Sequence, residues 1–147
     1  MTLTDCIALK PHASEVRRLN NWLDSAFIKS TLDPLVAADL KLCLNEIIAN
    51  LISHGFVDTP EPEIDIEISL QPGIGIATVE DNGRYFDLRR WKDPGRPKDL
   101  LSAPVGGFGI PLIRQRASRI EYDRLGNRNR LSITCTGRYP DIEQPSM

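Results

Sequence analysis

One segment of the sequence alternates strictly between apolar and polar residues. Its apolar positions are Ile64, Ile66, Ile68 and Leu70. The residues between them are Asp65, Glu67 and Ser69. A period of two predicts a strand with one buried face, which is typical of antiparallel sheets. Such a sheet needs a covering layer on its apolar face, so this segment restricts the chain to a layered fold.

Two helical patterns precede this strand. Ser14 is a candidate N-cap for the first helix, whose apolar face is Val16, Leu19, Leu23, Ala26 and Phe27. Asp33 is a candidate N-cap for the second, and Pro34 suits its first turn because no partner is needed for a backbone N–H there. Gly55 ends this helix, whose apolar residues are Leu40, Leu44, Ile47 and Leu51.

The remaining patterns complete an α+β domain. Further strands are predicted at residues 5–10, 74–79, 120–125 and 130–135. Residues 87–105 form a short helix and a mobile loop, a helix runs from Gly106 to about Ser118, and residues 126–129 form the last turn. This order predicts a two-layer sandwich in which helices cover one face of a mostly antiparallel sheet. One domain is expected over residues 1–138, with a disordered tail at 139–147.

Composition excludes several classes of protein. The formal net charge is −2, with 18 basic and 20 acidic residues. This balance lacks the basic excess of proteins that bind nucleic acids or membrane surfaces. No signal peptide, C-x-x-C pair or apolar run of about 20 residues occurs. Cys43 and Cys135 lie in apolar patterns, which predicts buried reduced thiols and a cytoplasmic protein.

The second predicted helix carries a polar stripe. Steps of four residues place Glu46, Asn50 and His54 on one helix face. A carboxylate and a carboxamide one turn apart offer a proton acceptor and an oxygen ligand for Mg²⁺, which binds few protein groups besides phosphate oxygens and water. Taken alone, an ordinary amphipathic helix explains this stripe better.

Two glycine-containing motifs follow. Asp81 comes at the end of an apolar strand, where its carboxylate can accept a hydrogen bond from an amine such as adenine N6, and Gly83 permits close backbone approach. Residues 106–109 read Gly-Gly-Phe-Gly before a helix, where free N–H groups can cradle phosphate. Taken alone, a strand-terminating turn explains the first motif better, and the glycine cluster is weak evidence because a flexible loop before a helix has the same composition. No P-loop and no G-x-G-x-x-G after a strand occurs.

Together and in this order, the three motifs resemble those of the GHKL (Bergerat-fold) ATPases. The sequence is most similar to the bacterial anti-sigma-factor serine/threonine kinases, a subgroup of stand-alone domains. The shared features are Glu-x-x-x-Asn-x-x-x-His-Gly, Gly-Gly-Phe-Gly-Ile-Pro-Leu-Ile-Arg-Gln, Tyr122-Asp123-Arg124 and Asn129-Arg130-Leu131.

The resemblance implies a role for each motif. Glu46 would be the general base or an orienting carboxylate for the acceptor serine hydroxyl, and Asn50 would bind Mg²⁺. Asp81 and Gly83 would read the adenine of ATP. The phosphates would be held by backbone groups of Gly107, Phe108 and Gly109. His54 would close the helix end near the site, or would be a packed structural histidine.

The resemblance also implies partners. The substrate would be a small anti-sigma-factor antagonist protein, phosphorylated on serine or threonine. A sigma factor would be sequestered in a partner switch, and the kinase would be a homodimer. Alternatives are a non-catalytic nucleotide-gated binding module, a detached histidine-kinase catalytic domain, and a regulator whose partners are not sigma factors.

The sequence departs from the family pattern at three positions. Tyr85 stands where many relatives have a second glycine, Asn129 where they place threonine near the nucleotide, and Val105 where some carry arginine. Arg96 or Lys98 could supply the missing charge as part of a basic lid over the phosphates. A solvated loop explains this basic run equally well.

Overall fold

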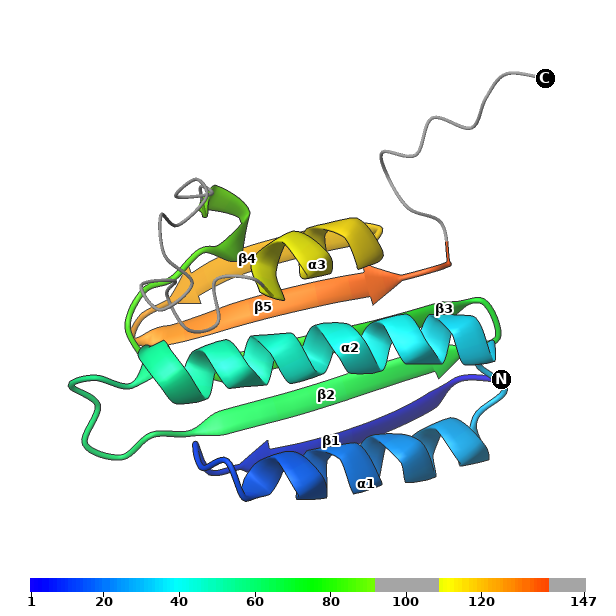
Figure 1. The fold of residues 1–147 in the computed structure, drawn as a ribbon, viewed down its shortest axis with the longest axis horizontal. Helices are drawn as coiled ribbons and strands as arrows, with labels where there is room; N and C mark the ends of the chain where they lie inside the picture. Colours follow the sequence, from blue (N-terminus) through cyan, green and yellow to red (C-terminus); the bar gives the residue numbers. More distant parts are fainter. Residues whose placement is uncertain (92–108, 138–147) are drawn as a thin grey trace, which may run out of the picture.

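The computed structural model describes residues 1–91 and 109–137. The elements, in chain order, are β1 (Leu3–Leu9), α1 (Glu15–Lys29), α2 (Pro34–Asn50), a π-helical turn η1 (Leu51–Gly55), β2 (Ile64–Gln71), β3 (Ile74–Asp81), a 3₁₀ turn η2 (Leu88–Arg90), α3 (Gly109–Arg116), β4 (Arg119–Leu125) and β5 (Arg128–Cys135). Figure 1 shows the three α-helices lying over the sheet, roughly along the direction of its strands.

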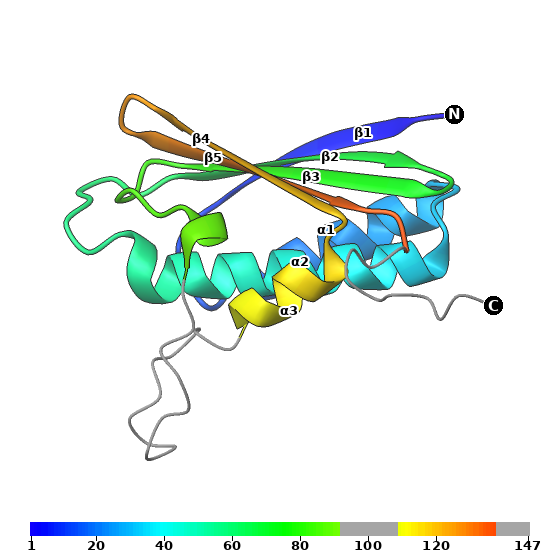
Figure 2. The ribbon, with the colours of Figure 1, turned by 90° about the horizontal axis from the view of Figure 1, so that it is seen from above.

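The strands form one sheet with the order β1-β2-β3-β5-β4, and every neighbouring pair is antiparallel. Seen from above, the helices form a second layer on one face of this sheet (Figure 2). The predicted α+β two-layer sandwich is therefore confirmed, and β1 lies at an edge of the sheet as expected.

The alternating segment is the strand β2 and lines the core. Its apolar side chains are buried and its acidic ones are exposed. Ile66 and Ile68 retain 1% and 0% of their accessible surface beneath the helices, where Leu40 and Leu44 of α2 are also fully buried. Each such aliphatic side chain contributes roughly 1.5–3 kcal/mol by leaving water.

Asp33 begins α2 as its sequence predicts. Its Oδ1 accepts a hydrogen bond from the N–H of Leu35 at 2.8 Å, and Pro34 occupies the first helical position. Ser14 occupies the N-cap position of α1 as predicted, but its hydroxyl makes no capping hydrogen bond. The preceding turn is already helical, so the N–H of Val16 donates to the carbonyl of Ala13 instead.

The helix α2 changes character at its C-terminal end. It is α-helical to Asn50 and continues as the π-helical turn η1 to Gly55. A π-turn has hydrogen bonds from residue i to i+5, so the angular step between residues is smaller. His54 lies within this π-helical turn.

The hairpin between β4 and β5 is tighter than predicted. Only Gly126 and Asn127 lie between the strands, and Gly126 has a φ of +63° that favours glycine. Arg128 and Asn129, predicted as turn residues, therefore belong to β5. The shorter turn places Asn129 directly opposite Asp81 of β3.

Cys43 and Cys135 are buried and free, as the sequence predicted, whereas Cys6 is exposed. Across residues 1–91 and 109–137, no helix has both the length and the apolar character needed to cross a bilayer. The predicted tail at 139–147 and most of the predicted loop at 87–105 lie outside the described residues.

Candidate functional site

A pocket of about 270 Å³ lies between the C-terminal end of α2 and the sheet. Its apolar walls are Ile47, Leu51, Val79, Ile110 and Leu131. Asn50, Asp81 and Asn129 place polar groups among them. The volume lies just below the range for ligand pockets, about 300–1,000 Å³. An apolar slot with a few polar groups can bind a flat, partly polar ring.

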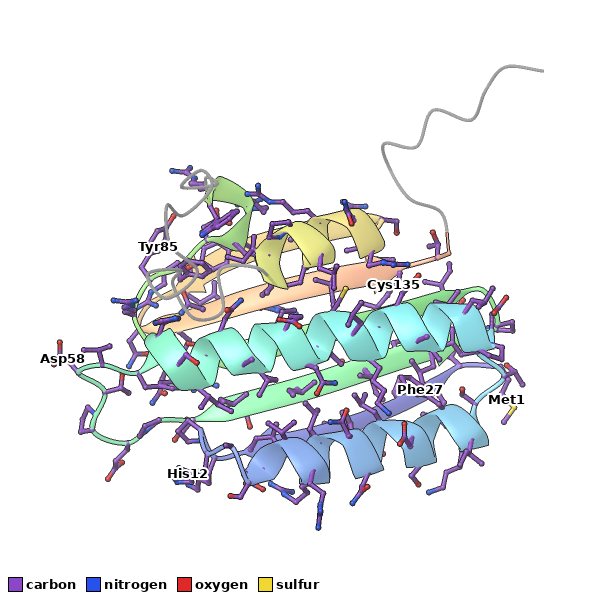
Figure 3. The ribbon with its side chains drawn as sticks, in the orientation of Figure 1. Met1, His12, Phe27, Asp58, Tyr85 and Cys135 are labelled. Carbon is purple, nitrogen blue, oxygen red and sulfur yellow. The ribbon has the colours of Figure 1, made fainter. Side chains whose placement is uncertain are left out.

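The pocket is built from segments far apart in the sequence. Its walls come from α2, η1, β3, β5 and the first described turn of α3. Tyr85 lies at the end of the molecule where α2 ends and the loop bearing Asp58 begins (Figure 3). Arg84 and Phe86 of the loop that follows β3 line the pocket.

Asp81 is the last residue of β3 and is buried. Its Oδ1 accepts two hydrogen bonds, from the N–H of Gly83 at 2.8 Å and from Nδ2 of Asn129 at 3.0 Å. No donor in the described part of the chain reaches Oδ2. Burial raises the pKa of this carboxyl, while the bonds from Asn129 and Gly83 act in the opposite direction. Oδ2 is therefore the oxygen left to accept from a ligand.

Gly83 is required by close packing of two backbone segments. A Cβ at this position would lie 2.3 Å from the carbonyl oxygen of Gly55 and 2.9 Å from Oδ1 of Asp81. The same Gly55 carbonyl accepts a hydrogen bond from the N–H of Arg84 at 3.0 Å. The sequence predicts that this glycine permits close approach to a ring, whereas the neighbour found here is the end of η1.

Asn129 is buried beside Asp81, and both the nitrogen and the oxygen of its side-chain amide form hydrogen bonds. Nδ2 donates to Oδ1 of Asp81 at 3.0 Å and to the carbonyl of Arg84 at 2.8 Å. Oδ1 accepts from Nη1 of Arg124 at 3.0 Å and from the hydroxyl of Tyr122. From the sequence, Asn129 belongs to a segment that resembles the family and also departs from it in residue type, and it is not predicted as a site residue.

A signal for this role is present in the sequence. Leu131, Ile133 and Cys135 alternate along β5 and face the core. Asn129 continues that alternation by one step, so it is a polar residue on the buried face of a strand. A buried amide requires hydrogen-bond partners, which makes such a position a candidate for a polar site.

Asn50 lines the pocket from the last turn of α2. Its Nδ2 is buried and has no hydrogen-bond partner in the described structure. A buried amide without a partner is costly, and a ligand with oxygen atoms would satisfy it. A phosphate group bound next to Asn50 would supply such oxygen atoms.

Glu46 lies one turn before Asn50 and is half-buried. A Cβ added to Gly109 would lie 2.2 Å from Oε2 of Glu46, so the carboxylate packs directly against the start of α3 as described. Glu46 is not among the residues that line the pocket in the described ranges. The structure thus places Glu46 beside the pocket and Asn50 in its wall.

The other residues singled out from the sequence are His54, Tyr85 and five residues that lie outside the described ranges. His54 lines the pocket and is exposed. The residues outside the described ranges are Arg96, Lys98, Val105, Gly107 and Phe108. Tyr85 is 54% exposed, and its ring meets that of Tyr122 edge to face, with centroids 5.7 Å apart.

Arg114 of α3 holds one wall of the pocket in place. Its Nη2 donates to the carbonyls of Leu88, Arg89 and Trp91 at 3.0, 2.9 and 2.6 Å. Its guanidinium also lies over the Trp91 ring, 5.8 Å from the centroid. These contacts fix η2 against α3, and they position Leu88 and Trp91 in the pocket lining.

Asp87 caps η2 from its buried position. Oδ1 accepts from the backbone N–H of Arg89 at 3.0 Å and from its Nε at 3.0 Å, and Oδ2 accepts from Nη2 at 2.9 Å. These bonds with Arg89 hold the pKa of the Asp87 carboxyl below its ordinary value.

The fold and this pocket define a histidine kinase-like ATPase domain. Residues 9–135 match the family described as "Histidine kinase-like ATPase domain", so the chain belongs to this family. The resemblance to GHKL ATPases inferred from the sequence is thereby confirmed.

Named relatives narrow the comparison. Serine/threonine-protein kinase BtrW of Bordetella bronchiseptica is 26% identical over 133 residues, which are 89% of this chain and 92% of that protein. Serine-protein kinase RsbW of Listeria innocua is 33% identical over 79 residues, which are 51% of this chain and 50% of RsbW. The match thus spans about half of the RsbW chain.

A solved structure supports the fold. The RsbU and RsbW domains of Rv1364c from Mycobacterium tuberculosis superimpose with a TM-score of 0.63 and 16% identity. The superposition covers 90% of this chain and 32% of that one.

Proposed function

We propose that this chain is a serine/threonine-protein kinase that binds ATP between α2 and the sheet. The observation that carries the proposal is the buried carboxylate of Asp81, with one oxygen in internal hydrogen bonds and the other left for a ligand. The similar proteins named as serine-protein kinases support the choice of acceptor.

The adenine ring occupies the apolar slot. Leu51, Val79 and Leu131 contribute apolar walls, and Oδ2 of Asp81 accepts a hydrogen bond from the 6-amine. The loop through Gly83, packed on the end of η1, closes this part of the slot.

The phosphates extend toward Asn50 and the start of α3. The Asn50 amide fits them, because its buried Nδ2 lacks a partner and its Oδ1 is a hard oxygen ligand of the kind that Mg²⁺ prefers. Magnesium, when bound, neutralises charge on the phosphate oxygens. Backbone N–H groups of Gly107, Phe108 and Gly109 complete the proposed phosphate site, of which only Gly109 lies in the described residues.

Glu46 is the proposed general base. The acceptor hydroxyl oxygen forms a bond to the γ-phosphorus, the bond from that phosphorus to the β–γ bridging oxygen breaks, and ADP leaves. The hydroxyl proton passes to the Glu46 carboxylate, which lies one turn from Asn50 and against Gly109. Positioning of the two reactants supplies most of the rate enhancement.

The proposed partners follow the anti-sigma-factor kinases that the sequence resembles. The acceptor is a small anti-sigma-factor antagonist protein. When the antagonist is phosphorylated, the kinase sequesters a sigma factor, and when the antagonist is unphosphorylated, the sigma factor is released. We further propose a cytoplasmic homodimer in which residues 1–138 of each chain form one domain.

The position of Glu46 favours one alternative. Because Glu46 lies beside the pocket rather than in its lining, a nucleotide-gated binding module without phosphotransfer is the second candidate. Such a module would bind ATP through Asp81 and Asn50 and would need no carboxylate at position 46.

A labelling experiment separates the two. The purified chain is incubated with γ-labelled ATP, Mg²⁺ and a candidate antagonist protein, alongside the variants Glu46→Ala and Glu67→Ala. Glu67 is an exposed carboxylate of β2 and serves as the matched control. Label on an antagonist serine or threonine, retained with Glu67→Ala and absent with Glu46→Ala, supports the kinase. ATP binding without any label supports the binding module.

A further inference from the structure

A chain of hydrogen bonds connects the β4–β5 hairpin to Asp81. Nη1 of Arg124 donates to Oδ1 of Asn129 at 3.0 Å, and the Tyr122 hydroxyl contacts the same oxygen. Nδ2 of Asn129 then donates to Oδ1 of Asp81 at 3.0 Å. Arg124 also donates to the carbonyl of Gly83 at 2.9 Å, and Nδ2 of Asn129 donates to the carbonyl of Arg84. The hairpin therefore binds two successive carbonyls of the loop that follows Asp81.

The orientation of the Asn129 amide within this series of hydrogen bonds follows from which neighbouring groups donate and which accept. A guanidinium only donates hydrogen bonds, so the Asn129 atom that faces Arg124 has to be the oxygen. The amide nitrogen must then face Asp81 and the Arg84 carbonyl, which are both acceptors. Turning the Asn129 amide over would oppose its nitrogen to the Arg124 donor at one end and its oxygen to two acceptors at the other.

The consequence for Asp81 is a carboxylate with a single orientation. Asn129 and Asp81 are paired residues of adjacent strands, and each is 4% exposed. Oδ1 is occupied by two donors, Nδ2 of Asn129 and the N–H of Gly83. Rotating the carboxylate would break both bonds, so Oδ2 stays directed to the ligand as an acceptor.

We propose that Asn129, held by Arg124 and Tyr122, selects a 6-aminopurine by fixing Asp81 as a pure acceptor. This inference rests on the proposed ATP site. Asn129 acts through Asp81 and is therefore a positioning residue rather than a group that touches the base. Adenine places an N–H donor opposite Oδ2, whereas a 6-oxopurine places an acceptor there and an unsubstituted purine places no polar group.

Loss of Asn129 releases the carboxylate. Asp81 can then rotate, and it loses a donor that favours its charged form. A mobile carboxylate still accepts from adenine, but it can also turn away from a 6-oxo group. Discrimination between bases therefore falls more than affinity for any one triphosphate.

The test measures dissociation constants of the full chain for three triphosphates by calorimetry. These are ATP, inosine triphosphate with its 6-oxo group, and purine riboside triphosphate with hydrogen at C6. The parent chain is expected to prefer ATP over each analogue by about 100-fold or more, because an unmatched polar group in a buried site is strongly disfavoured. Asn129→Ala is expected to reduce both ratios by roughly 10-fold.

Two further variants sharpen the result. Arg124→Met removes the group that fixes the direction of the Asn129 amide, so the ratios are expected to fall as well. If Asn129→Ala does not fold, Arg124→Met carries the test. Arg130→Ala is the matched control, because Arg130 is the next residue of β5 and lies exposed on the opposite face of the strand. Its ratios are expected to equal those of the parent chain.

The outcomes distinguish this inference from the proposed function. A parent chain that binds none of the three triphosphates contradicts the ATP site itself. A parent chain that binds ATP and inosine triphosphate equally well overturns base selection and leaves nucleotide binding intact. Undiminished ratios in the folded Asn129 and Arg124 variants overturn the role of Asn129 alone.

Discussion

Asn129 and Asp81 face each other across β5 and β3, and Nδ2 of Asn129 lies 3.0 Å from Oδ1 of Asp81. This contact links the last hairpin of the chain to the proposed adenine site. It explains how a residue outside the three glycine and acidic motifs can control the chemistry of one of them. The position departs from the family pattern, but the side chain is fully integrated into the site.

Replacing Asp81 by asparagine is expected to weaken ATP binding. The new oxygen can still accept from Gly83 and Asn129, but an amide nitrogen replaces Oδ2 and opposes the adenine amine with a second donor. The expected loss is about 1–3 kcal/mol of binding free energy, measured by calorimetry. Unchanged affinity in Asp81→Asn would remove Asp81 from the adenine site.

The same variant tests the ionisation of Asp81 without ligand. Burial raises the pKa of the folded carboxyl above its ordinary value of 3.8. Between the unfolded and folded pKa values the folded state binds more protons, so the parent chain loses stability as pH rises through this window. Asn does not titrate, so Asp81→Asn should gain stability relative to the parent from pH 4 upward. Urea unfolding at a series of pH values measures this, and the opposite trend would contradict the effect of burial.

Much of this site was predictable from the sequence. Period-two and helical patterns predict which face of each element is buried, because burial of apolar surface determines both. The Asp-Asn-Gly turn after an apolar strand and the Asn on a helix face indicate Asp81, Gly83 and Asn50 only when the motifs are taken together, because each alone is typical of an ordinary turn or helix.

The remainder depends on geometry that local patterns do not contain. A two-residue difference in the length of the last turn decides whether Asn129 lies in a loop or opposite Asp81. Gly83 is needed because the end of η1 approaches it, and the π-helical turn that produces this approach has no distinct sequence pattern. Ser14 has the residue type of a cap, but the preceding backbone has already satisfied the N–H group it would bind.

Gly83→Ala is expected to destabilise the folded protein. Its Cβ would lie 2.3 Å from the Gly55 carbonyl oxygen, and backbone cannot move aside as a side chain can. Overpacking of this kind costs about 1–3 kcal/mol. Gly73→Ala is the matched control, since no atom lies within 4 Å of the added Cβ, and its effect should stay within about 0.5 kcal/mol. Equal melting temperatures for the two variants would argue against the contact between Gly83 and η1.

Gly109→Ala is expected to reduce phosphotransfer more than stability. The added Cβ would lie 2.2 Å from Oε2 of Glu46, which is the end of a flexible side chain and can move away. If Glu46 is the general base, this displacement lowers the rate by about 10–100-fold while ATP affinity changes little. Single-turnover labelling and calorimetry measure the two effects. An unchanged rate with displaced Glu46 would contradict its role as base.

Asp87 tests whether the shape of the pocket depends on η2. Asp87→Asn keeps a capping oxygen for the N–H of Arg89 but removes the charged pair, whose Arg89 partner is 45% exposed and screened by solvent. The expected loss of stability at neutral pH is therefore below about 1 kcal/mol. Asp87→Ala loses the cap as well and should cost about 1–2 kcal/mol.

The pH dependence of these two variants follows from the Asp87 pKa. Because Arg89 lowers the folded pKa of Asp87, its contribution is present above the unfolded pKa and is lost as pH falls through the folded pKa. Asp87→Asn and the parent chain should therefore converge in stability at low pH. Leu88 of η2 lines the pocket, so Asp87→Ala should also weaken ATP binding at neutral pH. Full ATP affinity in that variant would show that the pocket keeps its shape without the cap on η2.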